Sequence, residues 1–276
     1  MSTDADRAKA LHDEAKRLEA FLSGLSAEAW QRPSRCDQWL VADVVAHLIE
    51  DRHAERITRG LQGDLTPSGF VPDETLSEDV LQASVTQHPI TLRRQLGDDL
   101  LAAFYTENER VDHMLSGLKP EDCDTLCYHP GSPRPIRTMI VIRLMELALH
   151  GWDIRASFDP QASLSEDVLP SLLQTMPRAV RRAFRPDANR TRAVLYRFNM
   201  TEPVTAVTDI ILNADGASVE SASTVEADVT FHCDTSTAIL VIFGRLPLAD
   251  AIADGRIDVE GEPELAAAFE QGFQGG

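Results

Sequence analysis

Residues 136–154 read IRTMIVIRLMELALHGWDI, a run of helical length that is apolar nearly all round. A helix of this composition is packed against protein on most of its faces. Its main polar residues fall at i, i+3, i+7 and i+10 and so form one stripe: Arg143, Glu146, His150 and Asp153. Because burying an unpaired charge costs several kcal/mol, these side chains need mutual pairing or a bound cation.

Glu146 and His150 are one helical turn apart, a spacing at which a carboxylate oxygen and an imidazole nitrogen reach one metal ion. The same spacing also gives an ordinary Glu–His hydrogen bond, and from this segment alone that interpretation is favoured. His47 is the natural third ligand, because it flanks the apolar stripe of a second predicted helix, although a core histidine bonded to a backbone carbonyl is the commoner role. Two acidic residues near it could orient its ring: Asp43 and Glu50.

The chain changes character near residue 160. Helical spacing of apolar residues covers 4–23, 40–59, 90–117, 136–157 and 165–184. After Pro186, alternating apolar and polar residues predict strands, with Asp215-Gly216 as a turn between two of them. Three short helices (235–245, 246–255 and 264–273) and a strand (256–261) complete the pattern. The sequence therefore predicts an α+β fold of two domains, 1–160 and 161–276.

Composition excludes several classes of function. The 276 residues include 26 Lys and Arg against 44 Asp and Glu, a formal net charge of −18, which disfavours binding to nucleic acid or to a membrane surface. No stretch approaches about 18 consecutive apolar residues, and the first residues mix acids and bases, unlike a signal peptide. The four cysteines are sparse, as in a reducing compartment, so a cytoplasmic protein is expected.

Two motifs resemble those of a known family. CDQWLVADVVAHL (36–48), preceded by Trp30 and Pro33-Ser34, and ELALHGWDI (146–154) are similar to the motifs of the mycothiol-dependent maleylpyruvate isomerase family, within the DinB-like group of four-helix-bundle metalloproteins. GRLPLADAIADGRIDVEGEPELAAAF (244–269) resembles the small sterol-carrier-like α/β domain that follows the bundle in many members. The resemblance covers essentially the whole chain. It departs at Gln38 and Leu40, where members commonly carry Gly and Thr.

The resemblance implies a site and a type of chemistry. The family's metal ligands correspond to His47, Glu146 and His150, all present here. Two neutral imidazoles and one carboxylate leave a divalent ion, most simply Zn²⁺, with open positions at which a thiol becomes a thiolate. A cofactor such as mycothiol would supply that thiol, for cis–trans isomerisation or for S-transfer (an isomerase or a transferase). A metal-dependent hydrolase and a non-catalytic small-molecule binding protein are the alternatives.

Arginines are the remaining candidates. Arg245 is similar to an arginine of the family's second domain and, like Arg143, is a candidate catalytic residue. A basic cluster offers an anion pocket for the cofactor, or else salt bridges to acidic residues: Arg178, Arg181, Arg182, Arg185, Arg190 and Arg192. Cys123, Cys127 and His129 have the wrong spacing for a second zinc site, and no cysteine lies in a recognisable nucleophile setting. The expected partners are a small substrate and a thiol, and the chain is expected to be a monomer or a weak dimer.

Overall fold

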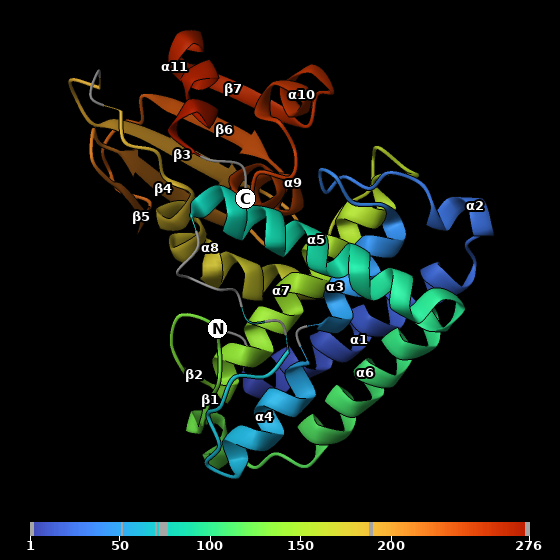
Figure 1. Cartoon of the computed structure of the whole chain (residues 1–276). Helices are drawn as coiled ribbons and strands as arrows, with labels where there is room; N and C mark the ends of the chain where they lie inside the picture. The colour runs from blue at the N-terminus through green and yellow to red at the C-terminus, as the bar shows by residue number, and fades with distance from the viewer. Residues whose placement is uncertain (1–2, 51, 70, 72–76, 188–189, 274–276) are drawn as a thin grey trace. The chain divides into compact units, whose positions relative to one another are not determined.

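The computed structural model describes residues 3–50, 52–69, 71, 77–187 and 190–273. The chain divides into two compact units, Met1–Ala162 and Ser163–Gly276. The domains that the sequence predicts cover residues 1–160 and 161–276. The first is helical and the second carries a mainly antiparallel sheet, which confirms the α+β fold (Figure 1). None of the described helices is both long enough and apolar enough to cross a membrane.

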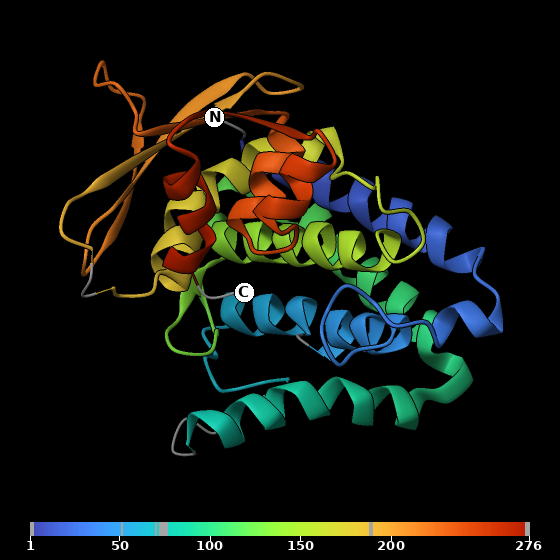
Figure 2. The same cartoon turned by 90° about the horizontal axis from the view of Figure 1, so that it is seen from above.

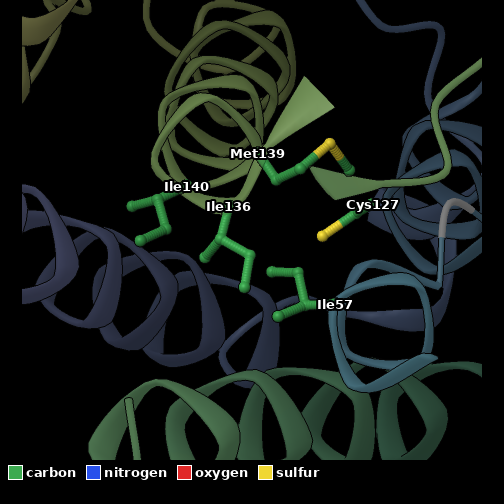
Figure 3. Packing of buried hydrophobic residues seen from close by; sticks show 5 residues of the cluster. All are labelled: Ile57, Cys127, Ile136, Met139 and Ile140. Carbon is green, nitrogen blue, oxygen red and sulfur yellow. The ribbon is translucent and has the colours of Figure 1, made fainter. Parts of the chain in front are cut away.

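The first unit is a bundle in which α1 and α3 each pack against both α6 and α7. Its helices are α1 (Asp4–Ser23), α2 (Ala27–Trp30), α3 (Val41–Glu50), α4 (His53–Leu61), α5 (Glu78–Leu96), α6 (Leu100–Ser116) and α7 (Ile136–Arg155). Short 3₁₀ turns (Gly97–Asp99 and Pro120–Asp124) and a two-stranded ladder, β1 (Leu126–Cys127) with β2 (Arg134–Pro135), connect them. At one end of α7 the core is closed by the side chains of Figure 3: Ile57, Cys127, Ile136, Met139 and Ile140.

Two helix boundaries differ from the prediction. The single helix over 40–59 was wrong, because α3 ends at Glu50 and Arg52 adopts a left-handed backbone (φ 45°) before α4 begins. The prediction of one continuous helix over 90–117 was also wrong, both in its first residue and in its continuity. That segment is two helices, α5 and α6, with Pro89 inside α5 and Gly97 at φ 52° between them. A glycine adopts positive φ without the steric cost that a side chain adds, so the chain can turn there.

The second unit is a five-stranded sheet of order β5-β4-β3-β6-β7, antiparallel except between β3 and β6. Its strands are β3 (Val194–Met200), β4 (Ala206–Leu212), β5 (Ala217–Ser221), β6 (Val229–Cys233) and β7 (Ile257–Gly261). Its helices are α8 (Leu169–Ala183), α9 (Thr235–Ile242), α10 (Leu248–Ala253) and α11 (Pro263–Ala268), with 3₁₀ turns at Glu166–Val168 and Glu270–Gly272. Alternate residues of β3 are buried, and the helices lie on that face of the sheet (Figure 2). The predicted Asp215-Gly216 turn is present, closed by the Asn213 N–H on the Gly216 carbonyl (2.8 Å).

Candidate metal centre

A tight turn positions the helix that carries His47. The backbone N–H of Leu40 donates to Asp43 Oδ2 (2.9 Å), so Asp43 caps the start of α3, and Arg93 Nε donates to its other oxygen (2.5 Å). This is the carboxylate half of a capping box, and it satisfies the N–H of Leu40; the other half, a side-chain oxygen at position 40 that accepts from the first turn of the helix, is one that leucine cannot provide. Gln38, in the same turn, has φ 69°, a conformation that favours glycine. A glycine here, which the resemblance leads us to expect, would adopt this φ without the steric cost that Gln38 carries.

The three predicted ligands come together although they are far apart in the sequence. His47 Nε2 on α3 lies 3.4 Å from Glu146 Oε2 on α7, and His150 Nε2 lies 3.1 Å from the same oxygen. The two imidazole rings are 4.8 Å apart at 83°. In a tetrahedral zinc site, nitrogen and oxygen ligands about 2.0–2.1 Å from the ion lie about 3.3 Å from each other. The donor set and its spacing therefore fit one divalent ion with open positions.

Each histidine is oriented by a carboxylate on its own helix. His47 Nδ1 is 2.8 Å from Glu50 Oε1, and His150 Nδ1 is 2.9 Å from Asp153 Oδ2. A proton on each Nδ1, donated to the carboxylate, leaves Nε2 free to face Glu146, as in zinc sites whose histidines are backed by carboxylates. Glu50, which the sequence suggests, therefore orients His47, whereas Asp43 caps the helix.

Burial and charge act together on the titration of the site. Burial disfavours charged His47, but hydrogen bonds to Glu146 and Glu50 outweigh it and raise the pKa of His47 to about 9. Burial likewise opposes charge on His150, yet Asp153, Cys36 and Glu146 raise its pKa well above the usual value. Burial alone would raise the pKa of Glu146, but hydrogen bonds from His150 and His47 hold it well below its usual range. Without metal, protons take the place of the ion.

An aromatic side chain shields the two histidines. The Trp39 ring lies 5.0 Å from the ring of His47 and 6.3 Å from that of His150. Its Nε1 donates to the Thr86 carbonyl on α5 (2.9 Å), which fixes the indole over the site. An indole over the imidazoles reduces their contact with water and strengthens electrostatic interactions between them.

Cys36, which the sequence did not indicate, is a neighbour of this centre. Its Sγ lies 3.4 Å from Asp153 Oδ2 and 3.7 Å from His150 Nδ1. The Arg35 N–H donates to the Asp153 carbonyl (3.0 Å) and so docks this turn on α7. The available signal was the position of Cys36 at the start of the first motif. By contrast, within the described part of the chain, Cys123, Cys127 and His129 belong to no group of potential metal ligands.

The structure places the predicted arginines in different settings. Arg143 is buried in the bundle, where it donates to the Leu48 carbonyl (2.5 Å) and to Asn108 Oδ1 (2.9 Å), which joins α7 to α3 and α6. Arg245 is half-buried directly after α9, with its N–H on the Leu240 carbonyl (2.8 Å). Three further arginines are exposed on α8: Arg178, Arg181 and Arg182. These last four belong to the second unit, and their roles remain predictions.

Comparison with known proteins matches both parts of the chain to families. Residues 11–155 match the family described as mycothiol maleylpyruvate isomerase N-terminal domain, and residues 174–274 match the SCP-2 sterol transfer family. Among solved structures, the mycothiol-dependent maleylpyruvate isomerase has a similar fold, with 12% identity and a TM-score of 0.58 over 95% of this chain and 97% of that one. A histidine-to-alanine mutant of that enzyme gives 14% identity and a TM-score of 0.59 at the same coverage.

No curated protein sequence gives a significant match. The identities to the solved structures are low, so that likeness concerns the fold. The match of the first family is independent of the structures and spans more than half of the 276 residues. The chain therefore belongs to the mycothiol maleylpyruvate isomerase family.

Proposed function

We propose that this protein is a metal-dependent enzyme that uses a low-molecular-weight thiol, mycothiol, to isomerise a small electrophilic substrate. The observation that supports this most directly is the geometry of His47, Glu146 and His150. The Nε2 atoms of both histidines face the same oxygen of Glu146, at distances typical of ligands of one metal ion. The family match supports the thiol and the reaction type. S-transfer on an electrophile is the alternative with the same activated thiol.

The donor set suits Zn²⁺, which prefers nitrogen and carboxylate ligands and keeps open positions in catalytic sites. When bound, the ion supplies a positive charge that lowers the pKa of a coordinating thiol. His47 and His150 would hold it through Nε2 and Glu146 through Oε2. Glu50 and Asp153 keep the Nδ1 protons in place, and Trp39 limits access of water.

The reaction follows from the chemistry of a thiolate. The sulfur adds to one carbon of a conjugated cis double bond, and the electron pair moves to the neighbouring carbonyl. The resulting single bond rotates, and elimination of the thiolate re-forms the double bond in the trans configuration. In S-transfer the thiolate instead displaces a leaving group, which departs with the bonding electron pair. The first reaction regenerates the thiol and the second consumes it.

Arg245 and the α8 arginines are proposed to hold anionic groups of the substrate or the thiol, because a guanidinium pairs bidentately with a carboxylate. Arg143, bonded to Leu48 and Asn108, is proposed to act on the reaction only indirectly, by fixing α7. We further propose that the protein is cytoplasmic, that it is a monomer or a weak dimer, and that its partners are small molecules.

Metal content and thiol dependence test the proposal together. Purified protein is expected to carry about one zinc per chain, and His47→Ala is expected to lose it. His12→Ala is the matched control, since His12 also pairs with a carboxylate, Asp112, but on the surface. Unchanged metal content in His47→Ala would overturn the metal site. Turnover that persists in thiol-free buffer would indicate the hydrolase, and absence of both metal and turnover would indicate the binding protein.

A further inference from the structure

A second set of donor atoms lies behind the ring of His150. Cys36 Sγ, Asp153 Oδ2 and His150 Nδ1 surround one point, on the side of the imidazole away from Glu146. Their separations are 3.4 Å from sulfur to oxygen, 3.7 Å from sulfur to nitrogen and 2.9 Å from nitrogen to oxygen. None of these atoms belongs to the first triad, which uses Nε2 of the same ring.

These separations are close to those of a tetrahedral metal site. With Zn–S near 2.3 Å and Zn–N and Zn–O near 2.0–2.1 Å, sulfur lies about 3.6 Å from the nitrogen and the oxygen, which are about 3.3 Å apart. Both observed distances from Cys36 Sγ are therefore within a few tenths of an ångström of ligand spacing. Only the Asp153–His150 pair has to open, by about 0.4 Å.

The surroundings favour a cation at this point. Asp153 is fully buried and His150 nearly so, whereas Cys36 is half-buried and gives access from solvent. A carboxylate and a thiolate together balance the charge of a divalent ion. The turn is also held in place before any ion binds, because Arg35 N–H donates to the Asp153 carbonyl (3.0 Å) and Ser34 Oγ to the Trp39 carbonyl (2.9 Å).

We propose that Cys36, Asp153 and His150 Nδ1 form a second site, which takes a thiophilic divalent cation such as Cd²⁺ or excess Zn²⁺. Sulfur selects such ions over Mg²⁺ and Ca²⁺, which prefer oxygen ligands. Binding releases the thiol proton and the Nδ1 proton to solvent. The ion replaces the hydrogen bond by which Asp153 orients His150, so its presence alters the first centre through the shared ring.

The test is Cd²⁺ titration of metal-free protein, followed through the ultraviolet charge-transfer absorption of a cadmium–thiolate bond. Wild type is expected to develop absorption equivalent to one thiolate per chain, and Cys36→Ser to lose it. Cys123→Ser is the control, since Cys123 is a buried thiol outside this group. Absence of the band in wild type would overturn the proposal whether or not the variants fold. An undiminished band in Cys36→Ser would do the same.

A further variant separates this site from the proposed function. His47→Ala removes a ligand of the first triad but none of the second, so it is expected to lose zinc and keep the full cadmium–thiolate band. Loss of the band in this variant, with circular dichroism unchanged, would show that the two sites are not separate and would contradict the second site. The first site fails by a different result, retention of zinc by the double variant His47→Ala/Cys36→Ser, in which the second site has lost its thiolate.

Discussion

Replacing Glu50 by glutamine tests how far the proposed metal centre depends on the carboxylate that pairs with His47 Nδ1. The carboxylate is 5% exposed and lies 2.8 Å from His47 Nδ1, so its charge acts on the imidazole with little screening. Glutamine keeps the length and a carbonyl acceptor but loses the charge. A hydrogen bond to a charged group contributes about 1.5–3 kcal/mol and a neutral one about 0.5–1.5 kcal/mol. The difference, about 1–1.5 kcal/mol, corresponds to a loss of zinc affinity of roughly 5- to 10-fold.

The assay is competition for Zn²⁺ between each protein and a chelator of known affinity, at constant pH. Glu55→Gln is the matched control, because Glu55 is a more exposed carboxylate on α4 that pairs with arginines instead of a ligand histidine. Glu50→Ala, which removes the acceptor as well, is expected to lose more, up to about 100-fold. If Glu50→Gln binds zinc within twofold of wild type, the charge of Glu50 does not support metal binding by His47.

Three further outcomes are expected. In the metal-free protein the pKa of His47 is raised to about 9, so zinc must displace a proton from it at any lower pH. The affinity for zinc is therefore expected to rise with pH and to level off near pH 9. Calorimetry in buffers of different ionisation enthalpy measures the released protons, and an affinity independent of pH below 9 would contradict this. Gln38→Gly is expected to raise the free energy of unfolding by up to about 1 kcal/mol, by relief of a positive φ, whereas a decrease in urea melts would show that the side chain stabilises the turn. Gly60→Ala is expected to lower the free energy of unfolding by about 1–3 kcal/mol, because a Cβ would lie 2.7 Å from the Leu126 carbonyl and 2.8 Å from Cys127 Sγ. An unchanged free energy of unfolding in urea melts would mean that α4 shifts freely to accommodate the methyl group.

The sequence predicted the features that depend on residues close together along the chain. Glu146 and His150 share a stripe because of helical spacing, and the alternating strands after Pro186 gave the sheet. The assignment of His47 to the same site rested on the family resemblance, since no local pattern indicates that it lies next to Glu146, 99 positions away in the sequence. Cys36 was missed for the same reason, because its neighbours are contributed by α7.

The wrong helix boundaries have a physical cause as well. The amphipathic pattern of 40–59 continues across the break at Arg52, where neither glycine nor proline marks the turn. Both α3 and α4 contact α6 and α7, but α3 also packs on α5 and α4 on β1, and this tertiary packing offsets the steric cost of a left-handed arginine. The predicted helix 90–117 starts directly after Pro89, yet Pro89 lies inside α5, because a helix packed along α3 tolerates the loss of one hydrogen bond.

In the proposed metal centre, each histidine is paired with a carboxylate of its own helix, whereas the contact that brings the two helices together is tertiary. His47 and Glu50 are three residues apart on α3, and His150 and Asp153 are three residues apart on α7. Each imidazole can therefore be oriented by its own helix, before the helices meet. Glu146 is the element that both share, and its contact with His47 forms only when α3 packs against α7. A substitution in the packing of these helices should therefore change the spacing of the ligands while leaving their tautomers unchanged.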